Sequence, residues 1–557
     1  MADTAVQPFV FLPLGGCGEI GMNLNLYGYG PEENRKWVIV DLGVTFGDAS
    51  TPGIDIIMPD AGFIEERADD LLGIVLTHAH EDHMGAVARL WPRLRCPIYA
   101  TPFTAWLVRD RLQEFGLLNE VQVIEIGLDH RFELGPFDLQ LITLTHSIPE
   151  PNGLAIRTPA GMVLHTGDWK IDPDPLIGES TDVEALNALG EEGVLALVCD
   201  STNVFVEGHT GSEGEVREEL IRVVGEQKGK VAIASFASNV ARMETAMVAA
   251  EENGRRVCLV GRSMHRMSAA AKSVGLLNQF KPFVDENEAG FFPNDKILFL
   301  CTGSQGERRA ALSRIASGDH RNVSLGEGDT VIFSSRVIPG NEKDIIELKN
   351  KFVERGVELI TDRDGEIHVS GHPARDELRQ MYQWARPKLA IPVHGERRHL
   401  VEHAKLARDV QVGQAIAPHN GDLILLGPGK PGVIDEVPAG RLYVDGDVIV
   451  DAEAPSLKDR RKMSFVGHVT VAVSIDARGR ILEGPACLTR GIPDAPDFSL
   501  DAFEEEMEDV AHETLSRAKR VDAETAETLV MRAVRRRAQD IWGKRPLVDV
   551  IVLDENA

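Results

Sequence analysis

Residues 77–83 (THAHEDH) constrain this chain more than any other segment, because they follow an apolar run (LLGIVL) typical of a buried strand. Side chains alternate along extended backbone, so His78 and His80 point the same way, whereas Asp82 and His83 follow a reversal and can face a neighbouring position. Imidazoles and carboxylates are the ligands that Zn²⁺ and similar ions prefer. One segment therefore offers ligands to two metal ions. The plainer alternative is a polar loop with local hydrogen bonds.

Four further strand-like runs end in a side chain suited to such a site. These side chains are Asp41, His146, Asp168 and Asp200. Asp41 is either a turn residue or a partner that orients one imidazole from behind. Asp168 is well placed in the pattern to bridge two cations. Because α/β scaffolds assemble sites from successive strand ends, the recurrence decides against the polar loop.

Composition sets broad limits on the class of protein. A chain of 557 residues, 43% hydrophobic and 26% charged, predicts about three globular domains. Its formal charge of −28 argues against general nucleic-acid or membrane affinity, but it does not exclude a local basic groove or a metal-centred phosphate site. The six cysteines are scattered, without a CxxC pair, and indicate buried thiols. With no secretory signal and no membrane-length apolar run, we expect a cytoplasmic protein.

From about residue 213 the pattern changes to strands alternating with helices, with strands expected at 231–235, 257–260, 297–300 and 331–334. This alternation predicts a parallel sheet, and we interpret it as an inserted domain. Serines at the ends of its strands could bind an anion, although helix caps explain each equally well.

After the insertion, residues 369–373 and 391–396 supply His372 and His394 in settings where a strand precedes a glycine. We expect His394 to be a metal ligand, because the chain then returns to the first domain. The charged stretch 456–462 is interpreted as a linker. An alternating strand at 469–475, two helices and a strand at 547–553 then predict a small α/β domain.

Six motifs in this order, HAHEDH, THS, TGDWK, CDSTN, SGHP and PVHGE, resemble the ribonuclease J family, the bacterial metallo-β-lactamase nucleases with a β-CASP insertion. The resemblance covers nearly the whole chain, including PGNE at 339–342. It implies a metallo-β-lactamase αββα sandwich with an inserted β-CASP parallel-sheet domain and a small C-terminal α/β domain. The implied boundaries are 1–212 and 374–450 for the sandwich, 213–373 for the insertion, 451–463 for the linker and 464–557 for the last domain.

The resemblance also implies roles for individual residues. One metal would be held by His78, His80, His146 and Asp168, and the other by Asp82, His83, Asp168 and His394, with Asp41 supporting the site. Asp200, His372 and His394 fall on the β-CASP motifs; His372 would stabilise the transition state, and Asp82 or a bound water would handle protons. Ser370, Gly371 and His372 would line the path of the phosphate, and weaker nucleotide contacts would come from Ser235, Ser238, Arg242, Ser334 and Ser335. Pro373 and Met22 depart from the usual alanine and lysine.

The implied activity is metal-dependent 5′-to-3′ exonuclease cleavage of 5′-monophosphorylated single-stranded RNA, with endonuclease cleavage as well, in RNA maturation and decay. The resemblance implies two divalent ions, Zn²⁺ first and Mn²⁺ or Mg²⁺ as alternatives. It also implies a homodimer or homotetramer, other RNA-decay proteins as partners, and no membrane. Two alternatives stay open: a hydrolase of a small ester or thioester, and a non-catalytic RNA-binding scaffold. The insertion and His394 count against the first, and the complete ligand set counts against the second.

Overall fold

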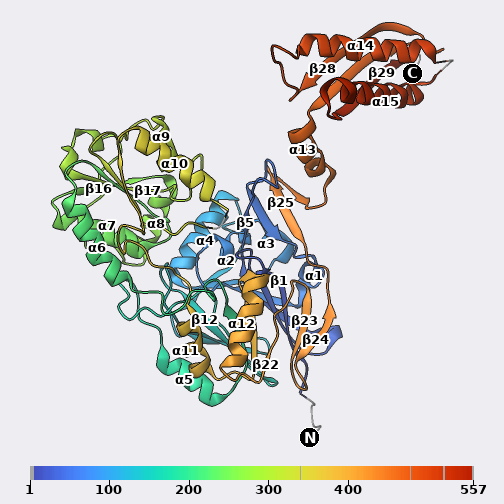
Figure 1. Ribbon diagram of the computed structural model, residues 1–557. Helices are drawn as coiled ribbons and strands as arrows, with labels where there is room; N and C mark the ends of the chain where they lie inside the picture. Colours follow the sequence, from blue (N-terminus) through green and yellow to red (C-terminus); the bar gives the residue numbers. More distant parts are fainter. Residues whose placement is uncertain (1–5, 339, 477, 519–520, 555–557) are drawn as a thin grey trace. The chain divides into compact units, whose positions relative to one another are not determined.

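The computed structural model describes residues 6–338, 340–476, 478–518 and 521–554 (Figure 1). Pro339 of the PGNE motif lies outside these residues. The chain forms two compact units, one made of Met1–Thr45 and Met58–Arg441 and the other of Phe46–Ile57 and Leu442–Ala557.

Two large sheets form the body of the first unit. The eight-stranded sheet has the order β24 (Gly432–Glu436), β23 (Asp422–Gly427), β1 (Phe9–Gly15), β3 (Leu24–Tyr29), β4 (Lys36–Leu42), β7 (Leu71–Val75), β8 (Ile98–Ala100) and β9 (Val123–Glu125). The seven-stranded sheet has the order β10 (Arg131–Leu134), β11 (Phe137–Thr143), β12 (Asn152–Thr158), β13 (Gly161–His165), β14 (Val194–Asp200), β20 (Leu389–Val393) and β22 (Gln414–Ala415). Their inner faces share one core, in which Phe11, Val40 and Ile424 pack with Leu154 and Val198.

Helices cover the outer faces of both sheets. On the seven-stranded sheet, α5 (Val183–Glu192), α11 (Arg375–Ala385) and α12 (Arg397–Asp409) contribute Leu186, Met381 and Leu406 to a second buried cluster. On the other side, α3 (Val87–Leu94) contacts α4 (Pro102–Glu114), and α4 contacts β8 and β9. The layers are therefore helix, sheet, sheet and helix, as the αββα expectation requires.

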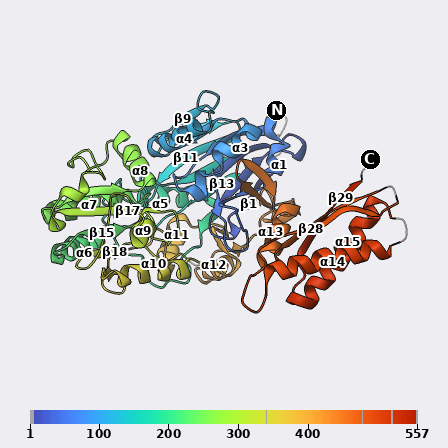
Figure 2. The ribbon, with the colours of Figure 1, turned by 90° about the horizontal axis from the view of Figure 1, so that it is seen from above.

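The inserted segment forms its own five-stranded sheet, in which every pair is parallel. Its order is β16 (Arg256–Val260), β17 (Ile297–Cys301), β15 (Val231–Ala234), β18 (Thr330–Phe333) and β19 (Glu358–Ile360). The helices of this part of the chain are α6 (Glu213–Glu226), α7 (Val240–Glu252), α8 (Arg262–Ser273), α9 (Ala311–Ser317) and α10 (Glu342–Glu354), and Figure 2 shows them grouped around the sheet. Leu312 of α9 and Phe352 of α10 pack against Phe299.

The insertion leaves the sandwich after β14 and returns just before α11 and β20. Strands β14 and β20 are neighbours that pair in parallel, with Asp200 opposite Val393. Because the carboxyl ends of parallel neighbours meet at one edge, Asp200 and His394 come together although they are far apart in the sequence.

The second unit contains α13 (Pro455–Val466) and a three-stranded sheet of order β28 (Ile481–Arg490), β27 (His468–Ile475) and β29 (Leu547–Asp554). Helices α14 (Leu500–Arg517) and α15 (Ala523–Trp542) pack on this sheet, where Met507 and Val534 meet Val471. A four-stranded sheet has the order β26 (Val448–Asp451), β25 (Arg441–Asp445), β6 (Ile56–Pro59) and β5 (Thr45–Phe46).

Two expectations about local structure need correction. Residues 369–373 form no strand but a loop, and the stretch 456–462 lies inside the helix α13. The sequence also did not predict β19 or β28. In the described part of the chain, no helix combines the length and apolarity needed to cross a membrane.

Candidate metal centre

The histidine-rich segment lies directly after β7. His78 and His80 occupy the loop, with Nε2 of His78 only 3.1 Å from Nδ1 of His80. Asp82 and His83 follow on the short helix α2 (Glu81–Met84), where Nε2 of His83 is 3.8 Å from Oδ2 of Asp82. The two pairs thus lie on different elements, the loop and α2, but they are not far apart, because the ring centroids of His78 and His83 are 4.1 Å from each other.

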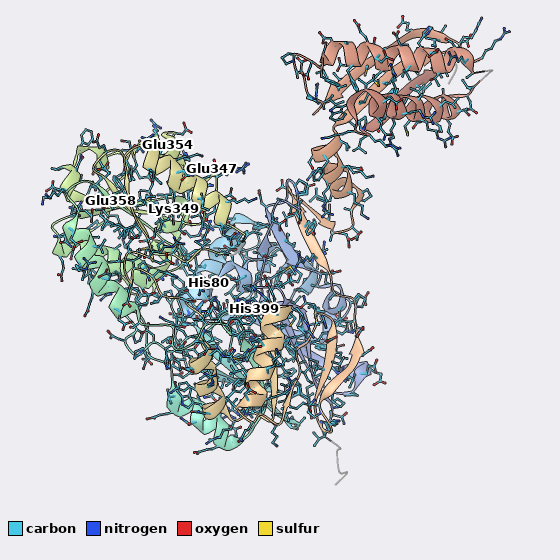
Figure 3. The ribbon with its side chains drawn as sticks, viewed as in Figure 1. His80, Glu347, Lys349, Glu354, Glu358 and His399 are labelled. Carbon is cyan, nitrogen blue, oxygen red and sulfur yellow. The ribbon has the colours of Figure 1, made fainter. Side chains whose placement is uncertain are left out.

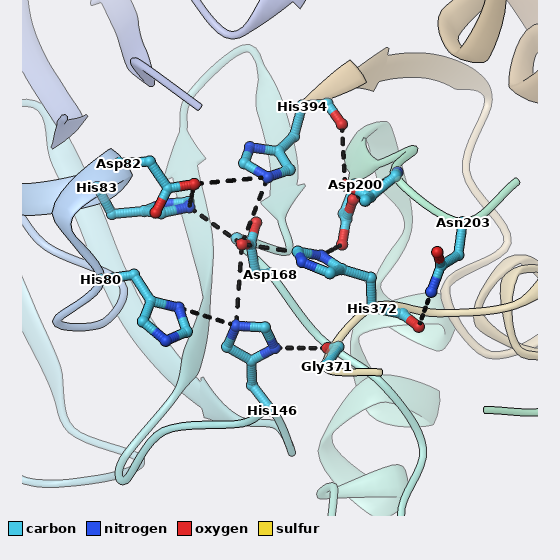
Figure 4. A network of polar contacts seen from close by, with 12 residues as sticks. His80, Asp82, His83, His146, Asp168, Asp200, Asn203, Gly371, His372 and His394 are labelled. Carbon is cyan, nitrogen blue, oxygen red and sulfur yellow. Dashed lines mark hydrogen bonds and ion pairs between the residues drawn. The ribbon is translucent and has the colours of Figure 1, made fainter. Parts of the chain in front are cut away.

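The other strand ends deliver their side chains to the same place (Figure 4). His146 follows β11, Asp168 follows β13, Asp200 ends β14 and His394 follows β20. His394 has a φ of 51°, in the left-handed region that few side chains adopt. Such backbone strain is concentrated at functional sites.

The carboxylate of Asp168 lies at the centre of this group. Its Oδ2 is 3.2 Å from Nε2 of His83 and 3.5 Å from Nε2 of His394. The same oxygen is 3.9 Å from Nε2 of both His78 and His146. Asp168 therefore faces ligands from both halves of the predicted site.

Three overlapping sets of side chains have ligand atoms within 4.8 Å of one another, and Asp168 belongs to all three. The sets are His78, His80, His146 and Asp168; Asp82, His83, Asp168 and His394; and Asp168, Asp200, His372 and His394. Nε2 of His394 and Oδ1 of Asp168 are buried without a hydrogen-bond partner. Buried polar atoms are nearly always satisfied, so these two fit metal coordination.

Electrostatics favours cation binding in the first set. Burial lowers the pKa of His80 to about 4, although the carboxylates of Asp82 and Asp168 oppose the shift. Burial and the neighbouring His80 also lower the pKa of His146. Burial raises the pKa of Asp168, but His394 and His83 outweigh it and hold that pKa well below its usual value. Neutral imidazoles and an ionised carboxylate are the forms that bind metal.

Three histidines of these sets have Nδ1 occupied, which leaves Nε2 to face Asp168. His83 Nδ1 donates to Oδ2 of Asp41 at 2.7 Å, as expected for a supporting carboxylate. His146 Nδ1 donates to the carbonyl of Gly371, and His394 Nδ1 lies 3.1 Å from Oδ1 of Asn23. Such partners fix the ring orientation and the tautomer of a ligand.

Sequence reasoning missed two of the supporting residues. Thr77 donates to Asp41 from both its amide nitrogen and its hydroxyl, each at 2.8 Å. Asn23 lies between His83 and His394, with Nδ2 3.1 Å from Nε2 of His83. Its one sequence signal is its position two residues after the glycine cluster 15–21 and directly before the buried strand β3.

His372 lies on the far side of Asp168 from His80. Its Nδ1 is 2.8 Å from Oδ2 of Asp200 and 3.8 Å from Oδ2 of Asp168. Burial lowers the pKa of His372, but these carboxylates outweigh it and raise that pKa to about 9. These carboxylates therefore favour the protonated imidazole.

The loop before His372 is held by Asn203, whose Nδ2 donates to Oγ of Ser370 at 2.8 Å and to the carbonyl of His372 at 2.9 Å. Gly371 packs so closely on His146 that a Cβ at this position would lie 2.6 Å from Cε1 of the imidazole. Only glycine therefore fits there without displacement.

The serines of the inserted domain differ in how they are placed. Oγ of Ser238 is 3.1 Å from Nε2 of His80, so this domain reaches the centre that Figure 3 locates by His80. Ser235 and Ser335 are buried, with 3% and 7% of their surface exposed.

The expectation that Arg242 and Ser334 contact nucleotides is wrong. Both are buried. The guanidinium of Arg242 donates hydrogen bonds to Glu213, to the carbonyl of Ser334 and to the carbonyl of Ile367 inside the protein. These side chains link parts of the inserted domain and present no surface to RNA.

Comparisons with known families agree with this geometry. Residues 228–352 match the ribonuclease J β-CASP domain, residues 455–555 the ribonuclease J C-terminal domain, residues 50–187 the β-lactamase superfamily domain, and residues 366–418 the Zn-dependent metallo-hydrolase RNA specificity domain. The chain is 46% identical to ribonuclease J of Sinorhizobium meliloti, over 98% of this chain and 97% of that protein. The chain belongs to the ribonuclease J family.

Other members of the ribonuclease J family are also similar. Ribonuclease J of Corynebacterium glutamicum is 37% identical over 98% of this chain and 76% of its own length. Ribonuclease J 1 of Streptococcus pyogenes is 39% identical over 86% of this chain and 85% of its own length. A crystal structure of an Enterococcus faecalis protein of unknown function shares the fold, with a TM-score of 0.50 and 16% identity over 75% of this chain and 100% of that one.

Family membership settles the general activity. This ribonuclease J family member is a metal-dependent ribonuclease with a metallo-β-lactamase domain and a β-CASP domain, and it binds RNA. The small-ester hydrolase and the non-catalytic scaffold are therefore set aside. The histidine and aspartate cluster around Asp168 is a group of side chains that could hold a metal ion.

Proposed function

We propose that the protein holds two Zn²⁺ ions and removes nucleotides in the 5′-to-3′ direction from 5′-monophosphorylated single-stranded RNA. The observation that carries the proposal is the position of Asp168, whose carboxylate lies within reach of two complete ligand sets. The first ion would be held by His78, His80, His146 and Asp168, and the second by Asp82, His83, Asp168 and His394. Histidine and carboxylate ligands suit Zn²⁺ best, with Mn²⁺ and Mg²⁺ as alternatives.

When bound at this centre, divalent ions would supply a nucleophilic water at neutral pH and would offset charge on the attacked phosphate. The protein's own residues would position the phosphate and stabilise the charge that develops on it. Because Nδ1 of His372 is bonded to Asp200 and the nearby carboxylates favour the protonated imidazole, its Nε2–H would donate to a phosphate oxygen as negative charge develops. Asp82, whose side chain is partly exposed, would accept a proton during attack.

The loop formed by Ser370, Gly371 and His372 would hold the scissile phosphate and the 5′-monophosphate, since it abuts His146 and carries the Asp200-bonded imidazole. Ser238 would contact the nucleotide from the inserted domain, with Ser235 and Ser335 as lesser contacts. Threading of a 5′ end gives exonuclease cleavage. Access of an internal segment to the same centre gives endonuclease cleavage.

We extend the proposal to the wider organisation expected from the sequence. The domain boundaries 1–212, 213–373, 374–450 and 464–557 stay a prediction, as do the homodimer or homotetramer, other RNA-decay proteins as partners, a role in RNA maturation and decay, and the cytoplasm as the compartment. Sedimentation of the full chain against a chain ending near Arg460 tests the assembly. Unchanged assembly would exclude a contribution from the last domain.

The activity itself is tested with one end-labelled single-stranded RNA carrying a 5′-monophosphate, a 5′-triphosphate or a 5′-hydroxyl, in the presence of Zn²⁺ or Mn²⁺. His80→Ala and a chelator serve as controls. Release of mononucleotides that favours the monophosphate and disappears in both controls is the expected result. Cleavage that ignores the 5′ group would contradict the exonuclease proposal.

A further inference from the structure

A buried carboxylate outside the metal centre ties together the segments that carry its residues. Glu377, in the first turn of α11, is fully buried. It accepts hydrogen bonds from the backbone nitrogen of Ile171 at 2.7 Å, of Thr210 at 3.1 Å and of Ala374 at 2.7 Å. The hydroxyl of Thr210 lies a further 2.7 Å from the same carboxylate.

The capping of α11 explains only one of these contacts. A glutamate at this position of a helix normally returns to the backbone nitrogen of the cap residue, here Ala374. The remaining donors come from elsewhere in the chain. Ile171 lies three residues after Asp168, and Thr210 lies where the chain leaves the sandwich for the inserted domain.

Thr210 extends the contact to His372. Its Oγ1 is 2.8 Å from the carbonyl oxygen of His372, so its single proton is shared between that carbonyl and Glu377. The other donor to the same carbonyl is Asn203, at 2.9 Å. The carbonyl of His372 is thus held by Thr210, where the chain leaves the sandwich, and by Asn203, just after the end of β14.

We propose that Glu377 and Thr210 are positioning residues, which fix the His372 backbone, and with it the imidazole, relative to Asp168. The proposal rests on the role of His372 given above. Glu377 accepts hydrogen bonds from three segments. Thr210 lies where the chain leaves the sandwich for the inserted domain, Ala374 lies where it returns, and Ile171 follows Asp168. One carboxylate therefore sets the geometry between the metal centre and the phosphate-binding loop, where an error of about 1 Å can cost about 100-fold in rate.

The test compares Thr210→Val, which keeps the shape of the side chain and removes the hydroxyl, with Thr210→Ser, which keeps the hydroxyl. Single-turnover cleavage of 5′-monophosphorylated RNA is measured at several enzyme concentrations, and bound metal is measured for every variant. We expect Thr210→Val to slow the cleavage step by about 10- to 100-fold, with half-saturation changed by less than about 2-fold and metal content unchanged. Thr210→Ser should restore the rate.

A second comparison separates positioning from a general structural role. In a His372→Ala background the imidazole that Thr210 positions is absent, so Thr210→Val should slow cleavage by less than about 2-fold further. A full additional loss in that background would overturn the inference. Glu377→Gln, which puts an amide nitrogen where one carboxylate oxygen accepted, should slow the same step at least as much as Thr210→Val.

The outcomes distinguish this inference from the proposed function. No cleavage by the wild-type protein with metal would remove the proposed function. Equal rates for the wild type and His372→Ala would remove the role of His372, and the inference with it. A normal rate for Thr210→Val beside a slow His372→Ala would overturn the inference alone.

Discussion

Nδ1 of His83 lies 2.7 Å from Oδ2 of Asp41, and both side chains are buried. The carboxylate is held in turn by the amide and the hydroxyl of Thr77. The segment that begins the metal-binding motif therefore also fixes the partner of its last histidine. Asp41 has a φ of 65°, a strained backbone maintained by this set of bonds.

Asp41→Asn should weaken metal binding, because an amide replaces one of two oxygens that accept from Thr77 and His83. Loss of such a partner typically lowers metal affinity by about 10- to 100-fold. Competition with a chromophoric chelator measures the change, with thermal unfolding as a control for the fold. An affinity equal to that of the wild type would show that Asp41 does not orient the ligand.

Gly371→Ala should disturb His146, since the new Cβ would lie 2.6 Å from Cε1 of the imidazole and 2.8 Å from Oγ of Ser147. We expect RNA cleavage to fall by about 100-fold while the protein stays folded. Gly432→Ala is the matched control, because a Cβ there meets nothing within 4 Å. Similar activity in both variants would contradict the close packing of the loop on His146.

His372→Ala should reduce cleavage of RNA by about 100-fold or more, because a protonated donor to the phosphate is lost. If the imidazole also assists the leaving group, a phosphodiester with a p-nitrophenolate leaving group should suffer a smaller loss. The ratio of the two losses is measured under identical metal conditions. Equal losses on both substrates would restrict His372 to charge stabilisation.

The buried pair of Glu213 and Arg242 should make stability depend on pH. Burial raises the pKa of Glu213, but the charges of Arg242 and Lys170 outweigh it and leave that pKa below its usual value. The pair thus stabilises the fold at neutral pH, and this contribution is lost as pH falls through the folded-state pKa.

Arg242→Met should lower the free energy of unfolding at pH 7 by about 3–5 kcal/mol, because it leaves the Glu213 carboxylate buried without its ion-pair partner. The difference from the wild type should shrink near pH 4, where Glu213 takes up a proton in the variant. Denaturant unfolding at both pH values measures this difference in unfolding free energy. Arg222→Met, at an exposed pair with Glu219, is the control and should change little. A pH-independent difference would contradict the account.

The sequence was most informative where function depends on residue type at strand ends. His78, His80, His146, Asp168 and His394 could be named because each follows an apolar run, and the structure brings all of them together. Parallel strands such as β14 and β20 place their carboxyl ends at one edge, which explains why His394 lies beside Asp200.

The remaining features depend on tertiary contacts that have no local signal. Asn23 and Glu377 look like a turn residue and a helix cap in the sequence, and only the fold shows what else they bond. Arg242 follows strand-end serines, as an anion-binding residue would, but the fold turns it inward to Glu213. The stretch 456–462 was interpreted as a linker because it is charged, yet arginine and lysine favour helices and Pro455 suits a first turn.

The most direct test of the account is the metal content of the purified protein, measured by elemental mass spectrometry beside the rate of RNA cleavage. We predict two bound ions per chain in the wild type. In Asp168→Ala, which removes the carboxylate common to both ligand sets, we predict loss of both ions together with activity. One ion in the wild type, or two ions retained in Asp168→Ala, would contradict the shared role of Asp168.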